Sequence, residues 1–136
     1  MKKLLDTTFH VHFLTDEDRV KPYLEANESP ETEFLASMIT MKELAVGIHH
    51  VEDDPSVADL RADFGWVDIL PFSMRHAFYA GQIEEALVQQ GTPQEQINAL
   101  GGDILIAGVA LAEDATIVTQ NTDDFELMPD VDVERY

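Results

Sequence analysis

The sequence contains no cysteine among its 136 residues, which excludes disulfide bonds and thiolate metal ligands. Positive charge is also scarce, because 8 Lys and Arg residues face 27 Asp and Glu residues, giving a formal net charge of −19. An apolar run long enough to span a bilayer is missing, and the short run after Met1 stops at Asp6, which argues against a secretory signal. We therefore expect a cytoplasmic protein that does not enter a membrane and that has no basic groove for polyanions.

The excess of acid does not indicate a disordered chain. Hydrophobic residues make up 45% of the sequence, so we expect one folded domain over residues 1–136 with the acids mostly on its surface. The acids are spread along the whole chain, which favours adaptation to a salty cytoplasm, as in halophiles, over a specialised acidic binding face. High salt screens the repulsion between such surface charges.

The most apolar stretch runs from Gly101 to Leu111 and holds one carboxylate, Asp103, near its start. A helix that is apolar on every side belongs inside a fold. An acid is tolerated at its beginning, where the first-turn N–H groups and the helix dipole stabilise negative charge. This stretch therefore predicts the central helix of an α/β domain, with Asp103 facing a cleft.

Short apolar stretches alternate with helical patterns along the chain. Strands are predicted at 2–6, 33–39, 66–72 and 115–119, with a fifth, edge strand at 131–133 in a tail that is otherwise a loop. Among the helices, one is expected to open at Thr40, and one from Ser73 to Gln90 is expected to carry Ala77, Phe78, Gly81 and Leu87 on its apolar side. This alternation predicts a mostly parallel four- to five-stranded sheet with helices on both faces.

In such sheets functional sites lie beyond the carboxyl ends of the strands, and four acids fall there: Asp6, Glu43, Asp103 and Asp124. Each has an ordinary structural interpretation, for example Glu43 as the capping-box partner of Thr40. Together they gather negative charge at one edge, which is costly unless a cation neutralises it. Oxygen ligands of this kind suit Mg²⁺ or Mn²⁺.

The histidines do not add a second metal site. His10 and His12 are two residues apart, and His49 and His50 are adjacent, so neither pair has the i, i+4 spacing of helical zinc ligands. We interpret all four as surface or partly packed residues.

Four stretches resemble the successive motifs of PIN-domain ribonucleases, and most closely those of VapC-like toxins of toxin–antitoxin pairs. They are Leu4-Leu5-Asp6-Thr7-Thr8, Met41-Lys42-Glu43-Leu44, Gly102-Asp103-Ile104-Leu105-Ile106-Ala107 and Val118-Thr119-Gln120-Asn121-Thr122-Asp123-Asp124-Phe125. The likeness spans nearly the whole chain, and it rests on the order and spacing of the motifs because no single one is specific.

The resemblance implies a Mg²⁺- or Mn²⁺-dependent endoribonuclease that cleaves structured RNA, such as tRNA or rRNA, with a metal-activated water. It implies an acidic core of Asp6, Glu43 and Asp103, with a fourth position left open among Asp124, Asn121 and Asp123. Thr8 would support Asp6, and Thr119 would help position water or metal. The resemblance also implies a homodimer that is silenced by a small antitoxin, a segment of which covers the cleft.

Two other interpretations of the acidic edge stay open. A receiver-like domain, phosphorylated on an aspartate, is favoured by Thr119 after the fourth strand, but no lysine follows Asp103 in the sequence. A PIN-like domain could also bind RNA or protein without cutting, although the complete set of acids argues against this.

Overall fold

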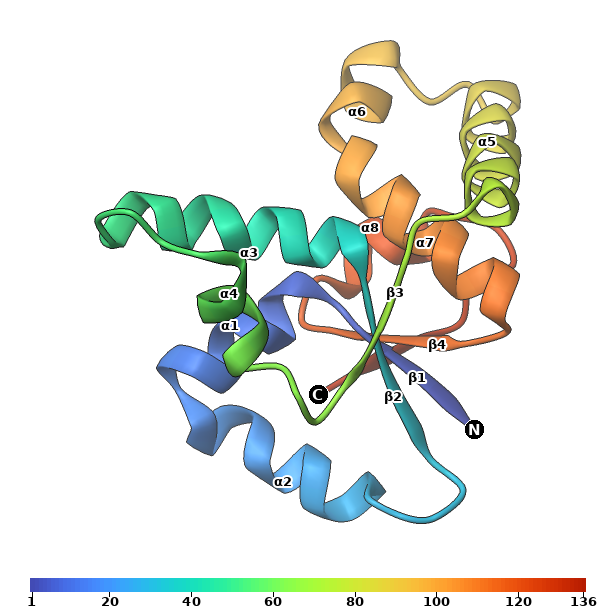
Figure 1. Cartoon of the computed structure of the whole chain (residues 1–136). Helices are drawn as coiled ribbons and strands as arrows, with labels where there is room; N and C mark the ends of the chain where they lie inside the picture. The colour runs from blue at the N-terminus through green and yellow to red at the C-terminus, as the bar shows by residue number, and fades with distance from the viewer.

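Five strands and eight helices alternate along the chain in the computed structural model, which describes all 136 residues (Figure 1). The strands are β1 (Lys2–Leu5), β2 (Glu33–Ser37), β3 (Asp68–Leu70), β4 (Thr116–Thr119) and β5 (Val133–Arg135). The helices are α1 (Thr7–Thr15), α2 (Glu17–Asn27), α3 (Met38–Val51), α4 (Val57–Ala62), α5 (Met74–Gln89), α6 (Gln94–Ala99), α7 (Gly101–Glu113) and α8 (Thr122–Glu126).

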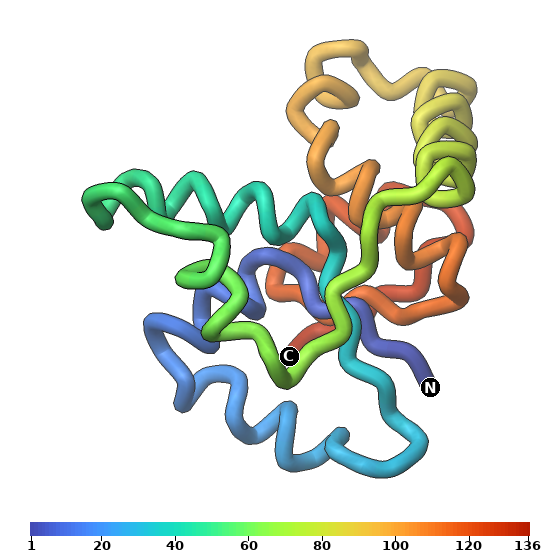
Figure 2. The backbone as a smooth tube through the Cα atoms, in the orientation of Figure 1, coloured from blue at the N-terminus to red at the C-terminus, as the bar shows by residue number.

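The strands form one sheet in the order β3-β2-β1-β4-β5, and every neighbouring pair is parallel. This confirms the α/β fold with a five-stranded parallel sheet. Leu4 of the central strand β1 pairs with Leu35 of β2 on one side and with Ile117 of β4 on the other. Because all strands run the same way, their carboxyl ends share one edge. In Figure 2 the backbone of β2 turns into α3 at this edge, and that of β3 continues toward α5.

Alternate residues of the central strands face two different cores, as the period of two in a strand requires. Leu4, Leu35 and Ile117 pack into a cluster of 16 buried residues with α5, α6 and α7. On the opposite face, Leu5 joins a smaller cluster under α1 and α2, and Ala36 joins another under α3 and α4. Helices thus cover both faces of the sheet, as expected.

Helix α7 is the central element of the larger core, in agreement with its all-round apolar sequence. It lies so close to α5 that a Cβ atom built at Gly108 would be 2.7 Å from the backbone nitrogen of Ala80. Only glycine permits this approach without displacing one of the helices. The close contact keeps α7 tight against α5 while its first turn, with Asp103, reaches the carboxyl edge of the sheet.

The helix after β2 begins earlier than predicted. Ser37 is its N-cap residue and accepts a hydrogen bond from the Thr40 backbone N–H at 3.1 Å, so α3 starts at Met38 and β2 ends at Ser37. The alternative interpretation of Glu43 as the capping-box partner of Thr40 is therefore wrong. Thr40 is buried in the first turn, and Glu43 lies in the second turn of α3.

The apolar side of α5 also differs from the prediction, although Ser73 does cap this helix. Its buried residues are His76, Ala80, Ile83 and Leu87, whereas Phe78 is 69% exposed. The face is rotated because His76 Nε2 donates to Glu113 of α7 at 2.8 Å while its other ring nitrogen, Nδ1, accepts from the Ser73 N–H. A histidine anchored at both nitrogens turns inward like an apolar residue.

Two further details correct the sequence interpretation. The segment after β4 is the short helix α8 where a loop was expected, and the edge strand β5 covers Val133–Arg135 where 131–133 was expected. His10 is fully buried between the aromatic rings of Phe9, Phe64 and Trp66, not partly packed at the surface. His49 and His50 are exposed, as expected.

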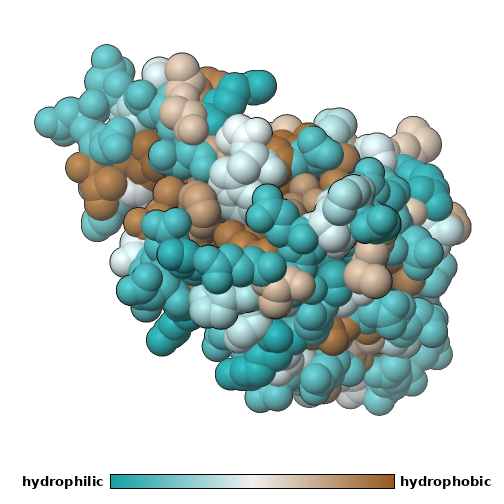
Figure 3. All heavy atoms as spheres, turned by 90° about the horizontal axis from the view of Figure 1, so that it is seen from below, coloured by the Kyte–Doolittle hydropathy of each residue, from teal (hydrophilic) through white to brown (hydrophobic).

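The surface matches the acidic composition. Hydrophilic side chains cover most of the face in Figure 3, and apolar side chains gather toward the side on which α3 and α4 lie in Figure 1. None of the helices combines the length and apolar character needed to cross a membrane.

Candidate active site

Asp6 lies between β1 and α1 and is only 4% exposed. Its Oδ1 accepts hydrogen bonds from the Thr8 N–H at 2.9 Å, the Thr8 hydroxyl at 2.6 Å and the Phe9 N–H at 3.3 Å. Its Oδ2 accepts only the Thr119 hydroxyl, at 2.6 Å. Three donors occupy Oδ1 and one occupies Oδ2, so Oδ2 keeps a lone pair free of protein donors.

Glu43 reaches the same edge from α3 and is held by a threonine of α1. The Thr7 hydroxyl donates to Glu43 Oε1 at 2.8 Å and lies 3.2 Å from the hydroxyl of Thr40. Thr40 Oγ1 is in turn 3.3 Å from the buried hydroxyl of Ser37. A row of hydroxyl groups therefore connects the end of β2 to Glu43 and fixes its distance from α1.

Asp103 and Asp124 are joined through one amide. The Asn121 side-chain nitrogen donates to Asp124 Oδ2 at 2.9 Å and to Asp103 Oδ2 at 3.4 Å. The Asn121 backbone N–H donates to the Thr119 hydroxyl at 2.8 Å, and that hydroxyl donates to Asp6. The turn between β4 and α8 thus contacts three of the acids.

The negative charge of this edge acts on Asp103. Burial, together with the negative charges of Asp6, Asp124 and Glu43, raises the pKa of Asp103 from 3.8 to about 6. Acids from three other parts of the chain therefore act on one carboxyl group. In the structure no three acidic or histidine side chains lie close enough together to hold one ion. Mutual repulsion between carboxylates opposes such a close approach when no cation is bound.

The sequence-predicted residues are thus mostly brought together. The charges of Asp6, Glu43 and Asp124 all act on Asp103. Thr8 and Thr119 donate hydrogen bonds to Asp6, and Asn121 donates to Asp124. Asp123 is exposed at the start of α8 and makes none of these contacts. All the donor atoms are oxygens, which fits the preference of Mg²⁺ and Mn²⁺.

Sequence reasoning missed three residues that reach this edge: Thr7, His12 and Tyr136. Thr7 directly follows Asp6, and its position at the start of a helix was the only signal for it. Tyr136 comes from the far end of the chain, and its hydroxyl lies 3.5 Å from Thr8 Oγ1 and 2.6 Å from His12 Nδ1. No local pattern indicates such a contact.

The PIN domain model matches residues 3–131, so the parallel sheet with its acidic edge is a PIN domain. Ribonuclease VapC2 of Rickettsia felis is 30% identical over 101 residues, which cover 74% of this chain and 72% of that protein. The chain therefore belongs to the VapC ribonucleases of the PIN-domain family. This assignment replaces the receiver-like interpretation.

A second relative matches along nearly the whole length. The tRNA(fMet)-specific endonuclease VapC of Salmonella typhimurium is 25% identical over 136 residues, covering 98% of this chain and 97% of that protein. Among solved structures, VapBC2 from Rickettsia felis bound to a DNA fragment from their promoter superposes with a TM-score of 0.83. The sequence identity there is 26%, over 100% of this chain and 99% of that chain.

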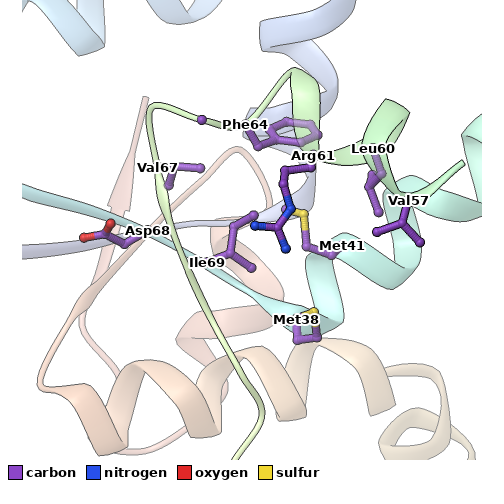
Figure 4. A pocket seen from close by; sticks show the side chains of 10 residues that line it. Met38, Met41, Val57, Leu60, Arg61, Phe64, Val67, Asp68 and Ile69 are labelled. Carbon is purple, nitrogen blue, oxygen red and sulfur yellow. The ribbon is translucent and has the colours of Figure 1, made fainter.

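A separate groove of about 400 Å³ lies between α3, α4 and β3, away from the acids. Its walls are mostly apolar, and Figure 4 shows them: Met38, Met41, Val57, Leu60, Phe64, Val67 and Ile69. Arg61 reaches toward the groove from α4, whereas Asp68 points away from it (Figure 4). Val57 is 77% exposed at its rim.

Proposed function

We propose that this ribonuclease is a Mg²⁺- or Mn²⁺-dependent endoribonuclease toxin that cleaves structured RNA at the acidic edge. The observation that carries the proposal is the raised pKa of Asp103, because the other three acids act on it from different elements. Perturbed carboxylates gathered at the carboxyl edge of a parallel sheet are typical of catalytic sites.

Asp6, Glu43, Asp103 and Asp124 would hold the cation. When bound, it would supply activated water and stabilise the charge that develops on the phosphate. The protein's own groups prepare this site. Asp6 presents Oδ2 because its Oδ1 is occupied by three donors, Thr7 restrains Glu43, and the Asn121 amide keeps Asp124 beside Asp103.

The position of Arg135 supports the proposal that the substrate is RNA. Register pairs it with Thr119 at the acidic edge, and its guanidinium donates to the Thr122 hydroxyl at 3.4 Å. It forms no ion pair, in a chain where acids outnumber bases 27 to 8. A guanidinium left free of carboxylates at this edge suits a backbone phosphate. The tRNA specificity in the name of the Salmonella relative favours tRNA, with rRNA as the other structured substrate.

Purified protein and total RNA, with Mg²⁺ or Mn²⁺, test this proposal directly. We expect discrete cleavage products that disappear with EDTA and return when either metal is restored in excess. Products unaffected by EDTA would contradict the metal dependence. Binding of RNA without any cleavage would favour a catalytically silent PIN domain.

We further propose that the apolar groove between α3 and α4 receives a segment of a cognate antitoxin. The similar Rickettsia felis structure is a VapBC2 complex, which supports a protein partner for this chain as well. An apolar hollow of this size beside few charges suits an amphipathic segment of a small protein partner. Exposed Met74 and Phe78 on α5, 90% and 69% exposed, support a homodimer through a different surface, which light scattering would detect.

Val57→Glu tests the groove, because Val57 is at its rim and the substitution leaves the core intact. We expect antitoxin binding to weaken by at least about ten-fold, since a carboxylate would be desolvated in an apolar contact. Val88→Glu, on the exposed side of α5, is the control and should bind like the wild type. Equal affinities for all three proteins by calorimetry would exclude this groove.

A further inference from the structure

A row of side chains connects the surface to Asp6. Arg19 Nη1 of α2 lies 3.3 Å from His12 Nε2, and His12 Nδ1 lies 2.6 Å from the Tyr136 hydroxyl. That hydroxyl lies 3.5 Å from Thr8 Oγ1, which donates to Asp6 Oδ1 at 2.6 Å. The row therefore crosses from α2 through α1 and the end of the chain to the acidic edge.

Only one arrangement of protons satisfies every contact in this row. A guanidinium can only donate, so His12 Nε2 must be the acceptor and His12 Nδ1 must carry the proton. His12 then donates to the Tyr136 oxygen, which leaves the Tyr136 proton free for Thr8. The Thr8 proton is already directed to Asp6. Every bond thus points the same way, from Arg19 toward the carboxylate.

The structure holds Tyr136 firmly in this row. Its ring packs edge-on against Phe9 at a centroid distance of 4.8 Å and against His12 at 5.8 Å. Its backbone oxygen accepts a hydrogen bond from the side chain of Gln120, one residue after Thr119. Tyr136 therefore links α1, which carries Thr8, to the end of β4, which holds the other oxygen of Asp6.

We propose that His12 and Tyr136 are positioning residues that act through Thr8 to orient Asp6. This inference rests on the proposed nuclease function and adds two residues to it. A chain of aligned donors polarises each following bond, so the Thr8 hydroxyl is held on Oδ1 and does not rotate toward the other acids. Oδ2 of Asp6 stays directed at the acids with which it would share a cation.

Tyr136→Phe tests the proposal, because it removes one hydroxyl and keeps the ring that packs on Phe9. We expect kcat to fall about two- to ten-fold, the worth of one hydrogen bond, with the KM for RNA unchanged. The Kd for Mn²⁺, measured by calorimetry without RNA, should rise by a similar factor. His12→Leu should have the same effects, and the double variant should be no worse than the stronger single one.

Conservative replacement separates positioning from packing. In His12→Asn the side-chain amide stands near the place of Nδ1–H, and we expect it to recover most of the lost kcat. Tyr79→Phe is the matched control, because that hydroxyl makes no hydrogen bond in the structure and should behave like the wild type. Unchanged kcat and Mn²⁺ affinity in Tyr136→Phe, or additive losses in the double variant, would overturn the inference.

Asp6→Asn distinguishes a failure of the inference from a failure of the proposed function. If wild-type protein cleaves RNA and Asp6→Asn does not, while Tyr136→Phe and His12→Leu equal the wild type, only the positioning row is rejected. If Asp6→Asn cleaves like the wild type, the nuclease site itself is rejected and the row falls with it. Measuring the melting temperature of every variant would establish whether each protein is folded.

Discussion

Asp103→Asn should abolish RNA cleavage and at the same time make the protein more stable. Its carboxylate is kept in a place where burial and the charges of Asp6, Asp124 and Glu43 all oppose ionisation. We expect kcat/KM to fall by roughly 10²–10⁴-fold, as for the loss of a group that acts on the transition state. The melting temperature should rise, because the neutral amide removes the repulsion.

The pH dependence of stability sharpens this prediction. The folded pKa of Asp103 is raised from 3.8 to about 6, so its repulsion destabilises the folded state fully above pH 6 and is relieved as pH falls from 6 to 3.8. Asp103→Asn should lack this relief. Asp53→Asn, in an exposed acidic loop, is the control and should keep wild-type activity. A variant that loses both activity and stability would instead assign Asp103 a structural role.

The other large effect concerns His10 and acid. Its ring is fully buried, and neither ring nitrogen has a well-formed hydrogen bond. Burial lowers its pKa from 6.5 to about 4, with a smaller opposing influence from the Leu5 backbone. The unfolded chain takes up this proton first, so stability is fully present above pH 6.5 and falls as pH drops toward 4. The loss amounts to about 3 kcal/mol over that window.

His10→Leu should remove this loss, because leucine fills much of the same apolar space and cannot bind a proton. Urea unfolding at pH 7 and pH 4.5 measures the effect as the difference between variant and wild type, so that the other acids cancel. His50→Leu, an exposed histidine of α3, is the matched control and should follow the wild type. Parallel pH curves for the wild type and His10→Leu would show that His10 does not carry the acid sensitivity.

Much of this fold can be predicted from local sequence patterns. The all-round apolar run of α7 predicted the central helix, and the alternation of strands and helices predicted a parallel sheet with Asp6, Glu43, Asp103 and Asp124 near one edge. These features depend on periodicity and on the geometry of parallel strands, both of which can be derived from sequence.

The features that were missed depend on contacts between distant residues. The start of α3 was misplaced because Thr40-x-x-Glu43 fits a capping box, whereas Ser37, three residues before Thr40, is the N-cap that the structure uses. His10 was interpreted as a surface or partly packed residue because its spacing from His12 does not fit a zinc site, but its neighbour Phe9 and the distant pair Phe64 and Trp66 enclose it. Tyr136 reaches Thr8 across 128 positions, a distance at which no sequence pattern operates.

The four acids have a further consequence through their order along the chain. They stand at positions 6, 43, 103 and 124 of 136, and each belongs to a different helix or strand end. A segment up to the middle of the chain holds only Asp6 and Glu43, and the remaining segment holds only Asp103 and Asp124. The four acids can therefore meet only after the chain has been synthesised through Asp124, and no shorter N-terminal fragment contains the complete set.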